Sequence, residues 1–238
     1  MGRPTVLPID PERAARRRDA LRSPTAAAVA GIIFALLYAS GMVLVRTAAP
    51  EDPTAGLDWL LENQRNFVLA LNLLPYSGIA FLWFMGVLRD RLGALEDQFM
   101  ATVLMGSGLL FLAMMFVGGA LAGGIIGTFP GLPETTLQSG LITYARVTAY
   151  QIINLYGVRM SAVFMTVSAT LWWRTNVMPR WLALISYPAA LLLLLNTTLS
   201  LWAGLVFPVW VLLVSILVLI LNVRERSRPA DPTAQAAS

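Results

Sequence analysis

The sequence predicts an all-α membrane protein, a polytopic bundle of about six transmembrane helices. Of its 238 residues, 57% are hydrophobic and only 13% are charged, whereas a soluble domain is roughly 45–50% apolar and about 25% charged. Several apolar stretches have the roughly 20 residues that a helix needs to cross about 30 Å of hydrocarbon. Arginines also gather in alternate connections between these stretches, as expected for a chain that crosses a bilayer repeatedly.

The predicted spans are 25-46, 67-88, 101-126, 149-173, 181-202 and 206-223. The last two come from one nearly continuous apolar run, which we divide at Trp202–Gly204, ahead of Pro208, because a turn and a proline are expected there. A cleaved signal peptide is the alternative to the first span, but its apolar stretch is long for one and no good cleavage site follows.

Three regions result from these spans. Residues 1-24 are predicted to be a disordered basic N-terminus, residues 25-223 a six-helix transmembrane domain, and residues 224-238 a disordered C-terminus. In the connections, Gly56–Asn66 and Pro133–Tyr144 mix leucine with polar residues. Each is either a short helix on the membrane surface or an ordered loop.

The arginines predict the orientation. Thirteen lie on one side of the predicted bundle and three on the other, with Arg159 inside a span. The three are Arg46, Arg65 and Arg146. Since cytoplasmic connections are enriched in Arg, both termini are predicted to be cytoplasmic.

Small residues predict where helices pack closely. Ala27, Gly31, Ala35 and Ala39 recur every four residues in the first span, and the third span carries Gly119 and Gly123. Such rows let another helix backbone approach. The neighbour could belong to the same chain or to a second copy. Tryptophans are predicted to form interface belts, with Trp83, Trp172, Trp173 and Trp181 on the cytoplasmic side and Trp59 and Trp202 on the other.

The residue types that are missing restrict the chemistry. The chain has no Cys and no His, and all 17 of its basic residues are Arg. It therefore cannot supply a usual zinc site, a thiolate nucleophile, a Ser-His pair or a histidine haem ligand. We predict no catalytic residues, no metal and no cofactor. The arginines lie in short clusters beside apolar runs, so nucleic acid is not an expected partner.

Arg159 is the candidate functional residue because it is the ionisable side chain placed well inside a predicted span, where a charge costs about 2.5–3.5 kcal/mol. Gln151, Thr166 and Thr170 recur with it at helical spacings, and Asn154 lies near that face. The predicted ligand-binding set is Gln151, Asn154, Arg159 and Thr166. Its expected ligand is an anionic group, such as a headgroup, a carboxylate or a phosphate. The alternative is that Arg159 only ties helices together.

Three stretches carry a family resemblance: Ser77–Gly93, Glu96–Val103 and Met178–Leu184. They resemble a family of uncharacterised six-span integral membrane proteins of actinobacteria, over most of the chain outside its ends. The resemblance implies six spans and the bacterial plasma membrane, and it implies no catalytic residues.

Three function classes remain open. The first is a non-enzymatic membrane protein that binds a lipid, or serves as a subunit beside a second copy or another membrane protein. The second is a small transporter, suggested by Pro75 and Pro188 at comparable places in two spans, since paired broken helices occur in transporters. Acids deep in the spans, which a proton-driven carrier needs, are missing. The third is a membrane enzyme, which would need to work without Cys, His or Lys.

Overall fold

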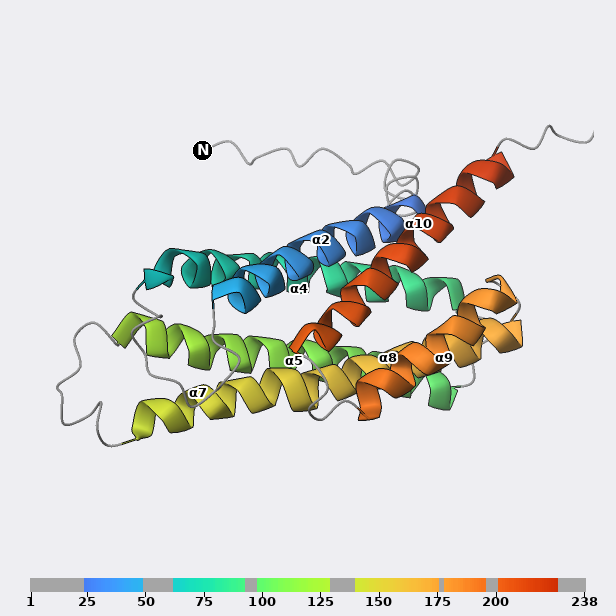
Figure 1. The fold of residues 1–238 in the computed structure, drawn as a ribbon. Coiled ribbons are helices and arrows are strands. Elements are labelled where there is room, and N and C mark those ends of the chain that lie inside the picture. Colours follow the sequence, from blue (N-terminus) through green and yellow to red (C-terminus); the bar gives the residue numbers. More distant parts are fainter. Residues whose placement is uncertain are drawn as a thin grey trace, which may run out of the picture.

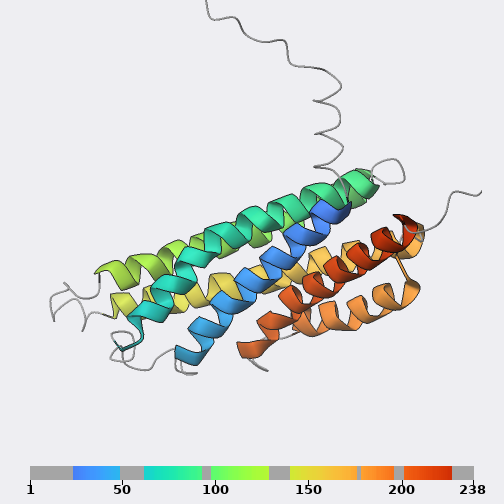
Figure 2. The same ribbon diagram turned by 90° about the horizontal axis from the view of Figure 1, so that it is seen from above.

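The computed structural model of the chain describes residues 24–48, 62–92, 98–128, 140–175, 178–195 and 201–226. These residues form helices that run along one long bundle (Figures 1 and 2). The helices are α2 (Pro24–Ala48), α4 (Gln64–Leu92), α5 (Gln98–Thr128), α7 (Leu141–Gln151), the π-helix η3 (Ile152–Gly157), α8 (Val158–Thr175), α9 (Arg180–Leu195), the 3₁₀-helix η4 (Leu201–Leu205) and α10 (Val206–Arg226).

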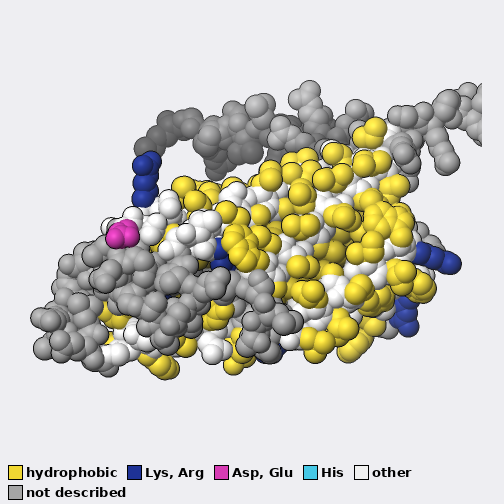
Figure 3. All heavy atoms as spheres, viewed as in Figure 1, with side chains coloured by type: hydrophobic (Ala, Val, Ile, Leu, Met, Phe, Trp, Pro, Cys, Tyr) yellow, Lys and Arg dark blue, Asp and Glu magenta, His cyan; other side chains and the backbone are white. Residues whose placement is uncertain are grey.

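The all-α polytopic architecture predicted from the sequence is confirmed. Within the described ranges, five helical stretches are long and apolar enough to cross a membrane: Thr25–Ala48, Gln64–Arg89, Gln98–Thr128, Leu141–Thr175 and Trp202–Val223. The sixth, α9, is apolar but has only 16 residues. Hydrophobic side chains cover most of the visible surface between charged side chains near the two ends (Figure 3). The protein is therefore a multi-pass membrane protein.

The predicted start of the sixth span at residue 206 agrees with α10, but the predicted end of the fifth span at residue 202 is wrong. Helix α9 ends at Leu195 rather than near residue 202, and Trp202, Ala203 and Gly204 lie in η4, which leads directly into α10. Pro208 is the third residue of α10. A proline in the first turn of a helix costs little, because the N–H it lacks would have no partner inside the helix. Pro208 thus belongs to the start of the last helix.

Neither Pro75 nor Pro188 breaks its helix. Both lie inside continuous helices, α4 and α9 respectively, and both residues are exposed on the outside of the bundle. A proline is tolerated within a membrane helix where other groups satisfy the freed carbonyl. The broken helices expected of a transporter are therefore not formed at these two prolines.

An aromatic cluster fills the centre of the bundle. Phe34 of α2, Phe81 of α4, Phe111 of α5, Phe164 of α8 and Phe207 of α10 are each at most 2% exposed. Their ring centroids lie 4.8 to 6.3 Å apart in the contacting pairs. Most of these pairs meet edge to face or tilted, which suits the ring quadrupoles. Five helices thus share one apolar core.

The two predicted rows of small residues are packing seams within the same chain. Gly31 lies so close to α10 and α4 that an added Cβ atom would stand 2.0 Å from Ser215 Oγ and 2.8 Å from Phe84 Cδ2. An added Cβ at Gly119 would stand 2.4 Å from Leu74 Cδ2 of α4. Ala27 and Ala35, which share the row with Gly31, are also buried. The missing side chains let these helices approach closely.

Polar side chains connect helices at two levels. Asn222 Nδ2 donates to Thr25 Oγ1 over 2.7 Å, so the end of α10 lies beside the start of α2. We call this end of the bundle the terminus side and the opposite end the far side. Deeper in the bundle, Trp210 Nε1 of α10 donates to Ser186 Oγ of α9 over 2.8 Å. These bonds satisfy polar groups that would otherwise lie unpaired in hydrocarbon.

Several predictions lie wholly or partly outside the described residues. Residues 1–23 and 227–238 are not described, so the predicted disordered ends stay predictions, although α10 continues to Arg226. The predicted surface segments are described only from residue 62 and from residue 140 onward. There α4 begins at Gln64 and α7 at Leu141.

Reporter fusions test the orientation. The start of α2 lies beside the end of α10, and α4 runs back to that same end of the bundle (Figure 1), so a reporter placed after Asn222 should lie on the same side as one within residues 90–93. The arginine distribution predicts that this side is the cytoplasm. Fusions near Pro53 and Pro133 should report export, measured with a paired phosphatase and fluorescent-protein assay. An exported C-terminus would contradict the orientation.

Candidate functional site

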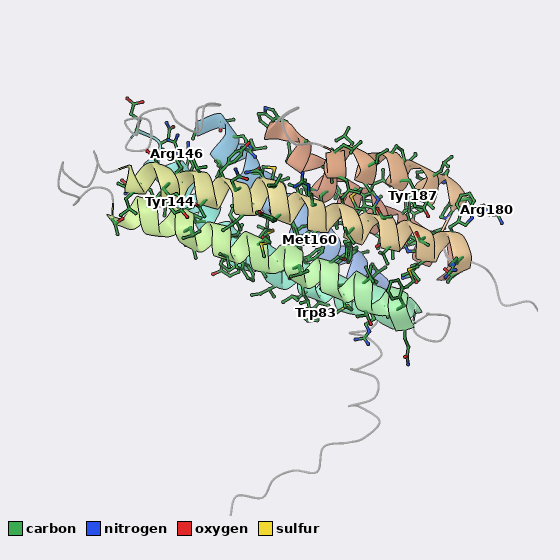
Figure 4. The ribbon with its side chains drawn as sticks, turned by 90° about the horizontal axis from the view of Figure 1, so that it is seen from below. Trp83, Tyr144, Arg146, Met160, Arg180 and Tyr187 are labelled. Carbon is green, nitrogen blue, oxygen red and sulfur yellow. The ribbon has the colours of Figure 1, made fainter. Side chains whose placement is uncertain are left out.

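Arg159 lies deep in the bundle, as predicted from its position in the sequence. It is the second residue of α8, and its neighbour Met160 lies about midway along the bundle (Figure 4). Arg174, in the last turn of α8, is fifteen residues away on the terminus side, which corresponds to about 22 Å of helix. When Arg174 is placed at the terminus-side border of a 30 Å hydrocarbon layer, the backbone of Arg159 lies roughly 8 Å short of the far border.

Arg159 is half-buried and forms no hydrogen bond or ion pair with the described part of the chain. A charge at this depth is costly unless it is paired or reaches polar groups. The side chain of a helical residue leans toward the helix N-terminus, which for α8 is the far side. Arg159 can therefore extend toward the far border and meet an anionic group there.

Thr166 and Thr170 lie on the same half-buried face of α8 as Arg159. Thr166 Oγ1 donates to the carbonyl of Ala162 over 2.9 Å, and Thr170 Oγ1 to that of Thr166 over 2.8 Å. The Thr170 hydroxyl is also 3.0 Å from the Tyr187 hydroxyl of α9. These hydroxyls are thus satisfied within the protein, which makes Thr166 a neighbour of Arg159 rather than a free donor.

A π-helix separates the remaining predicted residues from Arg159. Gln151 ends α7 and is exposed, and Asn154 lies within η3. A π-turn pairs residue i with i+5 instead of i+4, so it shifts the side chains before it relative to those after it. The sequence-predicted face assumed an uninterrupted α-helix. Asn154 instead points to a different cation, Arg46 of α2.

Arg46 is the residue that sequence reasoning missed. The sequence places it at the end of the span 25-46, among the three arginines of the arginine-poor side, but α2 continues to Ala48, so Arg46 lies in the last turn of that helix and is half-buried. Its Nη2 donates to Asn154 Oδ1. Its guanidinium carbon also lies 5.9 Å from the centre of the Tyr150 ring, within the range of a cation–π contact.

The Asn154 amide is oriented by two different partners. Its Nδ2 donates to the Tyr150 carbonyl over 3.0 Å, while its Oδ1 accepts from Arg46. Because an amide nitrogen cannot accept and an amide oxygen cannot donate, these partners define which end of the amide faces Arg46. Asn154 therefore holds the guanidinium in place against α7 and η3.

Close packing against α5 positions Tyr150 and Asn154. Gly140, with a φ of 73°, precedes α7, and its carbonyl accepts from Tyr144 N over 2.9 Å, which closes the first turn. Further along, a Cβ atom at Gly118 of α5 would stand 2.4 Å from Ile153 and 3.3 Å from the Ala149 carbonyl. The missing side chain lets α7 and η3 lie directly on α5. The neighbouring residues Tyr150 and Asn154 are thereby presented to α2.

The Arg46 guanidinium lacks one partner. Within the described part of the chain, its buried Nε atom makes no hydrogen bond, and the contacts of Arg46 there are with the neutral groups of Asn154 and Tyr150. A buried polar atom without a partner is uncommon in a folded protein and indicates strain, a bound species or a functional role. The one sequence signal for this site was an arginine at the very end of a predicted span.

Comparisons of the chain with known protein families, with curated proteins and with solved structures find no match. The resemblance to actinobacterial membrane proteins therefore stays a prediction.

Proposed function

We propose that the protein is a non-enzymatic membrane protein that binds a membrane lipid, alone or as a subunit beside a second copy or another membrane protein. The observation that carries this proposal is the half-buried charge of Arg159, which no described residue of the chain neutralises. A membrane arginine of this kind normally marks a site for an anion. Lipid headgroups are the anions always present at its border of the membrane.

The packing of the bundle supports lipid binding over transport. A transporter binds its substrate near the midplane, between its halves. Here the centre is occupied by Phe81, Phe111 and Phe207, while Arg159 lies on the half-buried face of α8. An anion at Arg159 would thus approach from the side of the bundle and not through its middle.

Retained lipid in the purified protein tests this function. Native mass spectrometry of the wild type should show bound lipid, and Arg159→Gln should lose at least about tenfold in occupancy, because a hydrogen bond to a charged group contributes roughly 1.5–3 kcal/mol. Arg159→Lys should also lose lipid, since an ammonium does not reproduce a bidentate contact. Each variant is first checked for normal melting.

Arg65→Gln is the matched control, because Arg65 is exposed at the start of α4. It should retain lipid like the wild type. Equal occupancy in the wild type, Arg159→Lys and Arg159→Gln would leave Arg159 a structural residue and remove the support for the proposal.

A further inference from the structure

The Arg46 site lies at the depth of lipid phosphates. Thr25 is held at the terminus side by its bond with Asn222, and Arg46 follows it by 21 residues in the same helix. This separation corresponds to about 32 Å, close to the 30 Å thickness of a hydrocarbon layer. When Thr25 lies at one border of the hydrocarbon, Arg46 therefore lies at the other, where the headgroups begin.

The described packing of η4 against α2 lies at Met42, one helical turn before Arg46. Met42 and Arg46 lie four residues apart, so they share one face of α2. An added Cβ atom at Gly204 of η4 would stand 2.7 Å from the Met42 methyl group, which shows that η4 packs against α2 at this level. Arg46 is one helical turn farther toward the far side.

The chemistry of the site suits a phosphate. A guanidinium presents donors in a planar fork that matches the oxygens of a phosphate. In Arg46, Nη2 donates to Asn154, whereas the buried Nε has no hydrogen-bond partner among the described residues. The partners of Arg46 in the described residues carry no negative charge. In low dielectric such a cation gains strongly from an anion. Tyr150 adds an amphipathic ring of the type that favours membrane borders.

We propose that Arg46, positioned by Asn154 and Tyr150, binds a phosphate group at the far border of the membrane, supplied by an anionic phospholipid headgroup or by free phosphate. Arg46 belongs to α2, whereas Arg159 belongs to α8 and starts below this border. The lipid form of the proposal rests on the proposed function. Asn154 is a positioning residue here, because its amide oxygen holds the guanidinium rather than the anion.

The test compares two lipids and inorganic phosphate on the full-length protein. Delipidated wild type is titrated with phosphatidylglycerol or phosphatidylcholine in detergent, and binding is read by native mass spectrometry. The wild type should prefer phosphatidylglycerol at least about tenfold, and both Arg46→Gln and Arg46→Lys should reduce that preference to the share that Arg159 contributes. Asn154→Ala should weaken it less, since the charge remains. Arg65→Gln is the control and should bind as the wild type does.

Free phosphate is distinguished in a parallel arm. If inorganic phosphate at millimolar concentration raises the melting temperature of the wild type but not of Arg46→Gln, the site takes free phosphate. If it does not, and the preference for phosphatidylglycerol depends on Arg46, the lipid headgroup is the source. Wild-type protein with no preference for phosphatidylglycerol and no response to phosphate overturns the proposal, even if the Arg46 variants fail to fold. Loss of lipid only in Arg159 variants would overturn it while leaving the proposed function intact.

Discussion

Phe207→Ala is expected to lower the free energy of unfolding by about 3 kcal/mol, toward the low end of what buried phenylalanines cost in soluble proteins. The Phe207 ring lies 4.8 Å from that of Phe111 and 5.6 Å from that of Phe81, centre to centre. Its removal leaves a cavity where four helices meet α10. The loss is limited because an unfolded membrane chain stays in hydrocarbon, so the penalty comes from lost packing and not from transfer to water.

Equilibrium unfolding in mixed micelles measures this effect. Phe207→Leu should cost less than the alanine variant because it leaves a smaller cavity. Phe99→Ala is the control, since Phe99 is 67% exposed, and a surface change of this kind is expected to stay within about 0.5 kcal/mol. Equal losses for Phe207→Ala and Phe99→Ala would mean that the aromatic cluster does not hold the bundle together.

Gly31→Ala is expected to destabilise the protein by about 1–3 kcal/mol, the usual cost of overpacking. The new methyl group would stand 2.0 Å from Ser215 Oγ and 2.8 Å from Phe84 Cδ2, so α2 must move away from α10 or α4. This expected loss of stability is opposite to the effect of helix propensity. At a helix position with free space, alanine is more favourable than glycine by roughly 0.5–1 kcal/mol. Melting in detergent is a sufficient measurement.

Gly86→Ala is the matched control, since a Cβ atom at Gly86 of α4 meets nothing within 4 Å. It should be neutral or slightly stabilising. Ser215→Ala gives a second check, because the buried Ser215 Oγ has no hydrogen-bond partner in the described ranges and its removal should cost little. Together with Gly31→Ala, it should recover part of the lost stability. Additive effects in that cycle would place the strain elsewhere.

The two arginines suggest how the protein meets its surroundings. Arg46 and Arg159 lie on the far half of the bundle, and neither has an acidic partner among the described residues. Two cations at different depths would favour anionic lipids on that side of the membrane. The predicted lipid dependence and the fusion topology together would identify the leaflet concerned.

The position of a charge in a span could be predicted from the sequence, but its partners could not. Arg159 was identified because depth along a helix follows from counting residues. Thr166 shares its face because α8 is regular between them. Asn154 contacts Arg46 because η3 interrupts the α-helical period. Nothing in the local sequence indicates a π-turn. A tertiary contact between residues 46 and 154 leaves no signal in hydropathy.

The sequence by itself determined the class of the protein, four of the helical spans to within four residues at each end, and the two rows of small residues that become packing seams. These follow from local composition, since hydrocarbon accepts only long apolar helices whose backbone bonds are internal. Only the tertiary structure decided where α9 ends, that Pro208 lies in the first turn of α10, and which side chains meet. Trp172, predicted as an interface anchor, is 1% exposed and stacks on Trp210. Lipid and protein interior are equally apolar, so hydropathy cannot tell a side chain that faces the bilayer from one that faces the core.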